Sequence, residues 1–157
     1  MGRRMGGGRP AAVACIQGSA AHPDIRGRVA FYPMKEGTLV AVSLQGLPCP
    51  CETCGRSVLG LHIHEGKACA GNSRDPFADA GGHYNPCDRP HPLHAGDLPP
   101  IFAGGGRAFS AVYTDRFQVC DVIGRTVILH AMADDFTTQP AGDSGEKIAC
   151  GVIRKMD

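Results

Sequence analysis

Histidine spacing is the feature of this sequence that most restricts the folds open to it. The spacings His-x-His, His-x7-His and His-x2-Asp occur, and a further histidine ends an apolar run. Histidines that only pack a core have no reason to recur in this way, so the pattern indicates a bound metal. A suitable fold must gather residues from distant segments: His62, His64, His83, His91, His94 and His130. The seventh histidine, His22, stands alone in a polar turn and is expected to bind nothing.

Length, charge and hydropathy exclude several classes of protein. A chain of 157 residues, 43% of them hydrophobic, suffices for one domain with a sizeable core. We expect residues 1–10 to form a flexible arm and residues 11–157 to form the domain. A net charge of +1 provides no basic surface for nucleic acid. No apolar stretch approaches the roughly 18 residues that span a bilayer. With no signal peptide evident, we expect a cytoplasmic protein without nucleic-acid or membrane partners.

The glycine, proline and apolar patterns predict an all-β fold. Twenty-two glycines and twelve prolines, with few helix-favouring runs, are typical of short strands joined by turns. Segments 66–100 and 131–146 are long and are expected to be functional loops. A closed antiparallel barrel or sandwich fits this pattern. The eight expected strands are Ala11–Gln17, Arg28–Tyr32, Gly37–Leu47, Ser57–Glu65, Ile101–Phe102, Ala108–Thr114, Val122–His130 and Lys147–Ile153.

His62 and His64 form the centre of the first candidate metal site. Side chains i and i+2 of a strand leave the same face about 6.5 to 7 Å apart, so both rings can reach one ion. The strand that ends in His130 would add a third imidazole, and a loop histidine would add a fourth. Four imidazoles in a tetragonal array favour Cu(II) by ligand type and by affinity order.

The first long loop supplies a second set of donors, His83, His91, His94 and Asp97. Three imidazoles and a carboxylate suit a tetrahedral zinc site with no open position, which is a structural arrangement. If His83 belongs to both sets, its ring binds one metal through each nitrogen, and the two sites must be adjacent. Zinc at both positions is the competing interpretation, because ligand type does not decide which metal a cell supplies. Any one histidine taken alone could equally be a surface residue.

Six segments, in matching order, resemble the copper/zinc superoxide dismutase family over about residues 11–154. They are GLHIHE (60–65), GGHYNP (81–86), HAGDLP (94–99), IGRTVILH (123–130), ADD (133–135) and ACGVI (149–153). The resemblance implies an eight-stranded Greek-key β-barrel, a flattened immunoglobulin-like sandwich, with two long functional loops. It implies copper bound by His62, His64, His83 and His130, and zinc bound by His83, His91, His94 and Asp97.

The same resemblance implies an enzyme that converts two superoxide anions and two protons to dioxygen and hydrogen peroxide by Cu(II)/Cu(I) cycling. His83 would be the bridging imidazolate and would carry a proton. Asp134 stands where the family has a carboxylate that links a copper-site histidine to a zinc-site histidine; the alternative is an aspartate on a loop surface. Cys69 and Cys150 occupy the positions of the family's intrasubunit disulfide. A stable barrel can protect such a bond in the cytoplasm.

Departures from the family pattern keep a second function open. Lys147 stands where the family has an arginine that guides the anion to copper, and it keeps the charge but not the planar fork. It is therefore an expected catalytic residue, or else only a charge at the start of a strand. Segment 131–146 is shorter than is usual in the family, and so is the part of loop 66–100 between His91 and His94. These differences affect the expected steering of the anion and the expected zinc geometry. The alternative function is a non-catalytic zinc- or copper-binding protein of the same fold.

The remaining cysteines and the oligomeric state have no firm interpretation from sequence. One cluster could hold a soft metal, form a local disulfide or stay reduced, and we favour the last two: Cys49, Cys51 and Cys54. A pairing of Cys87 with Cys120 cannot be deduced. Cys15 is expected to be buried in a strand. The sequence does not determine the oligomeric state, and a homodimer is kept as a candidate assembly.

Overall fold

The chain folds almost entirely into β-strands, which confirms the all-β prediction. The computed structural model describes residues 8–48 and 58–157. The cluster Cys49, Cys51 and Cys54 lies outside the described residues. The strands are β1 (Ala12–Gly18), β2 (Arg26–Met34), β3 (Gly37–Gln45), β4 (Val58–Leu59), β5 (Leu61–His64), β6 (Ile101–Phe102), β7 (Arg107–Thr114), β8 (Thr126–His130) and β9 (Lys147–Lys155). Helical structure in the described part is confined to the 3₁₀ turn η1 (Ala78–Ala80) and the short helix α1 (Val119–Val122). Neither is long and apolar enough to cross a membrane.

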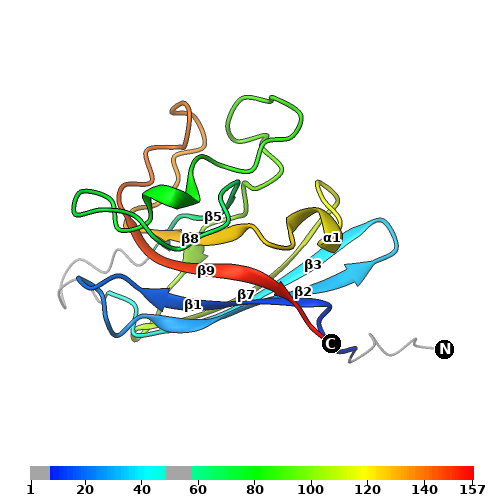
Figure 1. Ribbon diagram of the computed structural model, residues 1–157, viewed down its shortest axis with the longest axis horizontal. Helices are drawn as coiled ribbons and strands as arrows, with labels where there is room; N and C mark the ends of the chain where they lie inside the picture. The colour runs from blue at the N-terminus through cyan, green and yellow to red at the C-terminus, as the bar shows by residue number, and fades with distance from the viewer. Residues whose placement is uncertain (1–7, 49–57) are drawn as a thin grey trace.

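Seven strands form one antiparallel sheet, in the order β5-β8-β9-β1-β2-β3-β7. The sheet curls into a half-barrel, with the two long loops rising from the side that carries β5 and β8 (Figure 1). A second sheet pairs β4 with β6. Because β4 leads into β5 and β6 contacts β7, this small sheet joins the two edges of the large one. The chain crosses from β3 to the opposite edge at β5 and from β7 back to β8, which are Greek-key connections.

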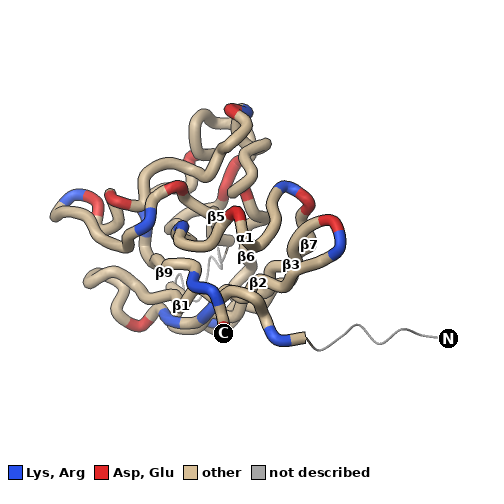
Figure 2. The backbone as a smooth tube through the Cα atoms, turned by 45° about the vertical axis from the view of Figure 1, so that its right-hand side comes forward, with Lys and Arg blue, Asp and Glu red and all other residues tan. Residues whose placement is uncertain are grey.

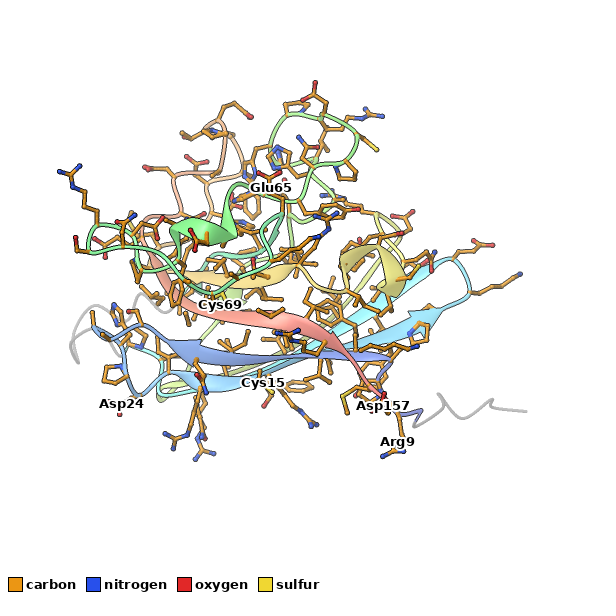
Figure 3. The ribbon with its side chains drawn as sticks, viewed as in Figure 1. Arg9, Cys15, Asp24, Glu65, Cys69 and Asp157 are labelled. Atoms are coloured by element: carbon orange, nitrogen blue, oxygen red, sulfur yellow. A yellow bond between two sulfur atoms is a disulfide. The ribbon has the colours of Figure 1, made fainter. Side chains whose placement is uncertain are left out.

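Strand alternation explains how the core forms. In β1, Ala14 and Ile16 are buried while Cys15 between them is exposed, because successive side chains point to opposite faces. Figure 3 shows Cys15 on the outer side of β1. The prediction that Cys15 is buried is therefore wrong. By contrast, every residue of β5 and of β8 is buried, because the barrel core covers one face of these strands and the long loops cover the other.

Most predicted strands differ from the observed ones by one or two residues at an end, and two differ more because the chain turns within them. The segment expected as Ser57–Glu65 is divided at Gly60, where an added Cβ would lie 2.9 Å from the Ser144 hydroxyl oxygen. The segment expected as Val122–His130 begins instead as the end of α1, and β8 starts only at Thr126. Gly124 has a φ of 85°, which favours glycine and turns the chain between the two elements. The prediction of a strand over residues 122–125 is therefore wrong, because the apolar composition of this run does not reveal the turn.

Loop 66–100 is attached to the free edge of β5 by backbone hydrogen bonds. The Tyr84 N–H donates to the Ile63 carbonyl, and the Ile63 N–H donates to the Gly96 carbonyl, each at 2.8 Å. The Arg125 guanidinium stacks on the Tyr84 ring at 4.0 Å and donates to the Glu65 carbonyl at 3.1 Å. A cation held over an aromatic face stabilises both groups. These contacts hold the loop against the strand that carries His62 and His64.

A disulfide between Cys69 and Cys150 ties the same loop to β9. Cys150 is 3% exposed and packs with Phe77, Ala80 and Ile128 in a small apolar cluster. The bond joins residues 81 positions apart, so it removes a large amount of loop-closure entropy from the unfolded chain. Among the described residues, Cys15, Cys87 and Cys120 form no disulfide, and all three are exposed.

Replacing both Cys69 and Cys150 by serine is expected to lower the free energy of unfolding by about 2–4 kcal/mol. Urea unfolding of the metal-free protein under non-reducing conditions measures this. Cys15→Ser is the matched control, because its exposed thiol should contribute less than about 0.5 kcal/mol. Equal stability of the double variant and the control would contradict the assigned role of the bond.

Candidate metal centre

Two groups of side chains that could bind a metal ion share one histidine. The ligand atoms of each group all lie within 4.8 Å of one another. The first group takes two residues from β5, one from the end of β8 and one from loop 66–100: His62, His64, His130 and His83. The second comes entirely from the loop: His83, His91, His94 and Asp97. The structure therefore brings together every residue that the sequence predicted for each metal site.

The pairing of β5 with its neighbours places the first group. His62 and His64 are two apart on β5, so they project from one face, as their spacing predicted. On the free side of β5, His64 forms an isolated bridge with His83, and His62 forms one with Asp97. On the other side, the register between β8 and β9 shifts between Leu129 and His130. Such irregularities commonly re-aim a side chain at a functional site.

Hydrogen bonds orient the rings of the first group. The Nδ1–H of His64 donates to the Gly81 carbonyl at 2.8 Å, and that of His130 donates to the Gly145 carbonyl at 3.3 Å. A carbonyl can only accept, so each ring carries its proton on Nδ1. Their two Nε2 atoms then face each other, without protons, at 3.3 Å. Two lone pairs at this distance repel unless a cation lies between them, so the geometry fits a metal ion.

Buried ring nitrogens without partners support the same conclusion. Nδ1 of His62, Nε2 of His83 and Nδ1 of His91 are buried and accept or donate no hydrogen bond among the described residues. Buried polar atoms without a partner are rare in native proteins, because they lose their hydration and regain nothing. Metal coordination would satisfy all three.

Asp97 organises the second group. Its Oδ1 lies 2.7 Å from Nδ1 of His83 and 3.2 Å from Nδ1 of His94, and its Oδ2 lies 3.1 Å from Nδ1 of His91. Three ring nitrogens and a carboxylate thus converge on one point. Nδ1 of His83 belongs to this group, its buried Nε2 makes no hydrogen bond among the described residues, and the same ring is also a member of the first group. A single imidazole therefore separates the two candidate sites.

Asp134 links the two groups by accepting a hydrogen bond from one histidine of each. Its two oxygens accept hydrogen bonds from Nε2 of His62 at 2.7 Å and Nε2 of His91 at 2.8 Å. The carboxylate is 1% exposed and also accepts the Phe136 N–H. Gly142 packs directly against this carboxylate, where a Cβ would collide with it. Asp134 thereby fixes which nitrogen of His62 and of His91 faces inward. It is not an aspartate on a loop surface.

Burial keeps the histidines of the first group neutral. It is the main cause that lowers the pKa of His62 and of His64 well below the usual range, and neighbouring histidines add to it. Burial also lowers the pKa of His130 to about 4 and outweighs the hydrogen bond to Gly145. For Asp97, burial acts to raise the pKa, but the hydrogen bond and charge of His83 outweigh it and the pKa is lowered. Neutral imidazoles and an ionised carboxylate are the forms that bind metal.

The metal-free protein is expected to lose stability as the pH falls from about 6.5 to about 4. His130 titrates near 6.5 when unfolded but near 4 when folded, so the unfolded chain binds more protons in this window. Above pH 6.5 His130 is neutral in both states and does not lower the free energy of unfolding. On acidification its protonation in the unfolded chain lowers that free energy, by about 3 kcal/mol at pH 4. Urea unfolding of chelator-treated protein at several pH values measures the slope. His130→Gln should give a shallower slope, and an unchanged one would show that His130 is not responsible.

Lys147 lies beside the first group but is engaged elsewhere. It pairs with His130 across β8 and β9 and lines a cavity of about 1260 Å³ together with His64 and His83. Its Nζ donates to Oδ2 of Asp75 at 2.6 Å and to the Phe77 carbonyl at 3.3 Å. Asp75 and the orienting carbonyls of Gly81 and Gly145 had no signal in the sequence. A surface-loop aspartate and two glycines are too common to be singled out.

The chain is similar to known dismutases over most of its length. Residues 25–153 match the family model for copper/zinc superoxide dismutase (SODC). A copper-zinc superoxide dismutase of Deinococcus radiodurans is 35% identical over 151 residues, which cover 85% of this chain and 79% of that protein. Copper-zinc superoxide dismutase 2 of Aquifex aeolicus is 30% identical over 147 residues, 83% of this chain and 80% of that protein. The superoxide dismutase-like protein YojM of Bacillus subtilis is 34% identical over 110 residues, 60% of this chain and 55% of that protein.

The family match and the paired histidine groups lead to one assignment. The matched segment spans more than half of the chain and includes both groups. The chain belongs to the copper/zinc superoxide dismutase family and is an oxidoreductase that dismutates superoxide with copper and zinc.

Proposed function

We propose that copper is held by His62, His64, His83 and His130, and that zinc is held by His83, His91, His94 and Asp97. The observation that carries this assignment is His83, which belongs to both groups and has one nitrogen on Asp97 and the other without a hydrogen bond. Four imidazole nitrogens suit copper, whereas three imidazoles and a carboxylate suit a closed zinc site. The zinc group has no donor from β5 or β8, so its ion would hold loop 66–100 in place.

Each residue of the proposed site would have a separate role in the reaction. Bound copper supplies one-electron chemistry, by which one superoxide is oxidised to dioxygen and a second is reduced to peroxide. His83 would take up a proton at Nε2 in one half of the cycle and deliver it in the other. Asp134 would hold His62 and His91 in the required tautomer. Lys147, at the cavity wall, would attract the superoxide anion.

Superoxide decay measured by pulse radiolysis tests the assignment. Protein reconstituted with copper and zinc, with the metal content determined on the same sample, should accelerate the decay, and protein loaded with zinc alone should not. Slow decay at full copper occupancy would instead favour the non-catalytic metal-binding protein of the same fold.

Three further expectations stay predictions. A homodimer is supported by Phe102 and Phe109, which are 74% and 77% exposed on β6 and β7 and line one surface hollow, because contiguous exposed apolar groups commonly mark a surface that a partner covers. Light scattering on the purified protein tests it.

The cytoplasmic location is tested by cell fractionation. Limited proteolysis tests the division into an arm of residues 1–10 and a domain of residues 11–157.

A further inference from the structure

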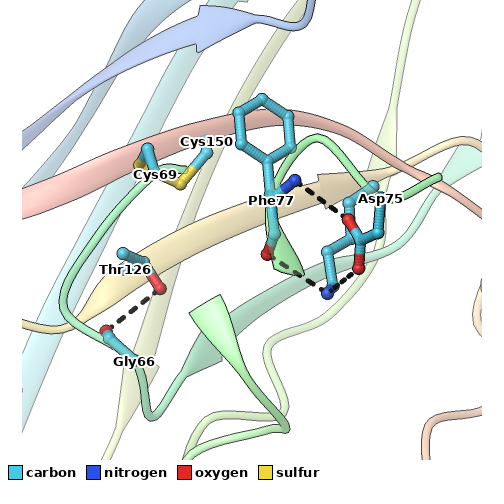
Figure 4. Close-up of a disulfide and its surroundings, with 7 residues drawn as sticks. Gly66, Cys69, Asp75, Phe77, Thr126 and Cys150 are labelled. Carbon is cyan, nitrogen blue, oxygen red and sulfur yellow. Dashed lines mark hydrogen bonds and ion pairs between the residues drawn. A yellow bond between two sulfur atoms is a disulfide. The ribbon is translucent and has the colours of Figure 1, made fainter. Parts of the chain in front are cut away.

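A carboxylate holds the Lys147 ammonium at the wall of the cavity that His64, His83 and His130 line. Its Nζ lies 2.6 Å from Oδ2 of Asp75, and the Phe77 carbonyl accepts a second hydrogen bond (Figure 4). The Lys147 side chain is 17% exposed and that of Asp75 is 38% exposed. Two of the three donors of the ammonium are therefore used by the loop, which leaves one for an incoming anion.

The loop presents Asp75 in a fixed position. Oδ1 of Asp75 accepts the Phe77 N–H at 2.9 Å. The side chain of Asn72 accepts the backbone N–H groups of Arg74 and Asp75 at 2.9 and 3.1 Å. The Cys69–Cys150 disulfide fastens the same loop to β9, three residues beyond Lys147 (Figure 4). The Asp75 carboxylate is therefore already in position to accept the hydrogen bond from Lys147.

The charges around the cavity make the Lys147–Asp75 ion pair important for the attraction of an anion. Acidic residues recur along the loops that surround β5 (Figure 2). Among the described residues, the cavity lining holds the carboxylates of Glu65, Asp75, Asp88 and Glu146 against the cations of Arg74 and Lys147. A lining with more acids than bases opposes the approach of an anion. Besides the charge of the bound metals, the freedom of the Lys147 ammonium then determines much of the attraction that the cavity lining offers to an anion.

We propose that Asp75 is a positioning residue that limits superoxide access by anchoring Lys147 away from the copper site. The inference rests on the proposed function, because it takes copper to be bound at His64 and His130. Replacing Asp75 by asparagine keeps an acceptor of the same shape but removes the charge that holds the ammonium. Lys147 is then free to direct its donors into the cavity.

The test compares Asp75→Asn with Asp88→Asn, each fully loaded with copper and zinc. Asp88 lines the same cavity, and the described residues include no ion pair between it and Lys147. Asp75→Asn should raise the second-order rate constant for superoxide about threefold or more at low ionic strength, and added salt should shrink the gain. The affinity of the copper-loaded protein for azide, a small anion, should rise in parallel at equilibrium. Asp88→Asn should change both quantities by less than about twofold.

The same substitution in a Lys147→Gln background shows whether Asp75 acts through the lysine. We expect the gain to be at most half as large there. An equal gain in the two backgrounds, an equal effect of Asp88→Asn, or a slower Asp75→Asn variant would each overturn the proposal. Failure of the proposed function looks different: the unmodified protein would leave superoxide decay unchanged at full copper content. Azide affinity would then still decide the role of Asp75, because it does not depend on turnover.

Discussion

Replacing His130 by alanine is expected to lower the copper-dependent rate of superoxide dismutation by more than about a hundredfold, since loss of even an outer partner of a metal ligand costs about 10–100-fold. His130 supplies the only nitrogen of the first group that comes from β8, and its Nε2 lies 3.3 Å from that of His64. The variant leaves the zinc group intact. Copper content should therefore fall while zinc content is retained.

His22→Ala is the matched control for this experiment. His22 belongs to neither metal-binding group, and its backbone hydrogen bonds to Ser19 and Ile25 survive the substitution. Pulse radiolysis and metal analysis on the same samples give both quantities. A His130→Ala variant that retains full copper occupancy and an undiminished rate would contradict the proposed copper site.

Removing both metals is expected to lower the unfolding temperature by at least about 10 °C. A ligand present at 1,000 times its dissociation constant stabilises the native state by about 4 kcal/mol, and each kcal/mol shifts the midpoint of a protein this size by about 2–4 °C. The physical reason is the set of buried ring nitrogens without partners on His62, His83 and His91. In the metal-free protein these nitrogens are desolvated and make no hydrogen bond among the described residues, and only Nδ1 of His91 has a carboxylate oxygen nearby, 3.1 Å away on Asp97.

Calorimetry of chelator-treated protein before and after reloading measures this effect. Magnesium in place of zinc is the control and should give no shift, because this cation prefers oxygen ligands. Asp97→Asn should reduce the shift produced by zinc, because it removes the one carboxylate of the second group. An unchanged midpoint after zinc and copper have been bound would mean that the groups do not hold the metals within the folded core.

Most of the candidate metal-binding residues could be predicted because their spacing carries geometric information. His62 and His64 had to share a face if residues 61–64 formed a strand, and His83, His91 and His94 had to lie in one long loop. The bounds of the elements were less predictable. The apolar run before His130 concealed both the end of α1 and the turn at Gly124, since apolar composition is the same in a strand and in a short buried helix.

The sequence by itself determined the candidate donor residues, the family and the all-β class, because these follow from residue types at fixed separations along the chain. The tertiary structure alone decided which nitrogen of each ring faces inward, since Gly81, Gly145 and Asp134 reach the rings from segments far away in the sequence. It also decided that Lys147 is paired with Asp75, 72 residues away. Orientation and charge pairing depend on contacts in space, and no local pattern encodes them.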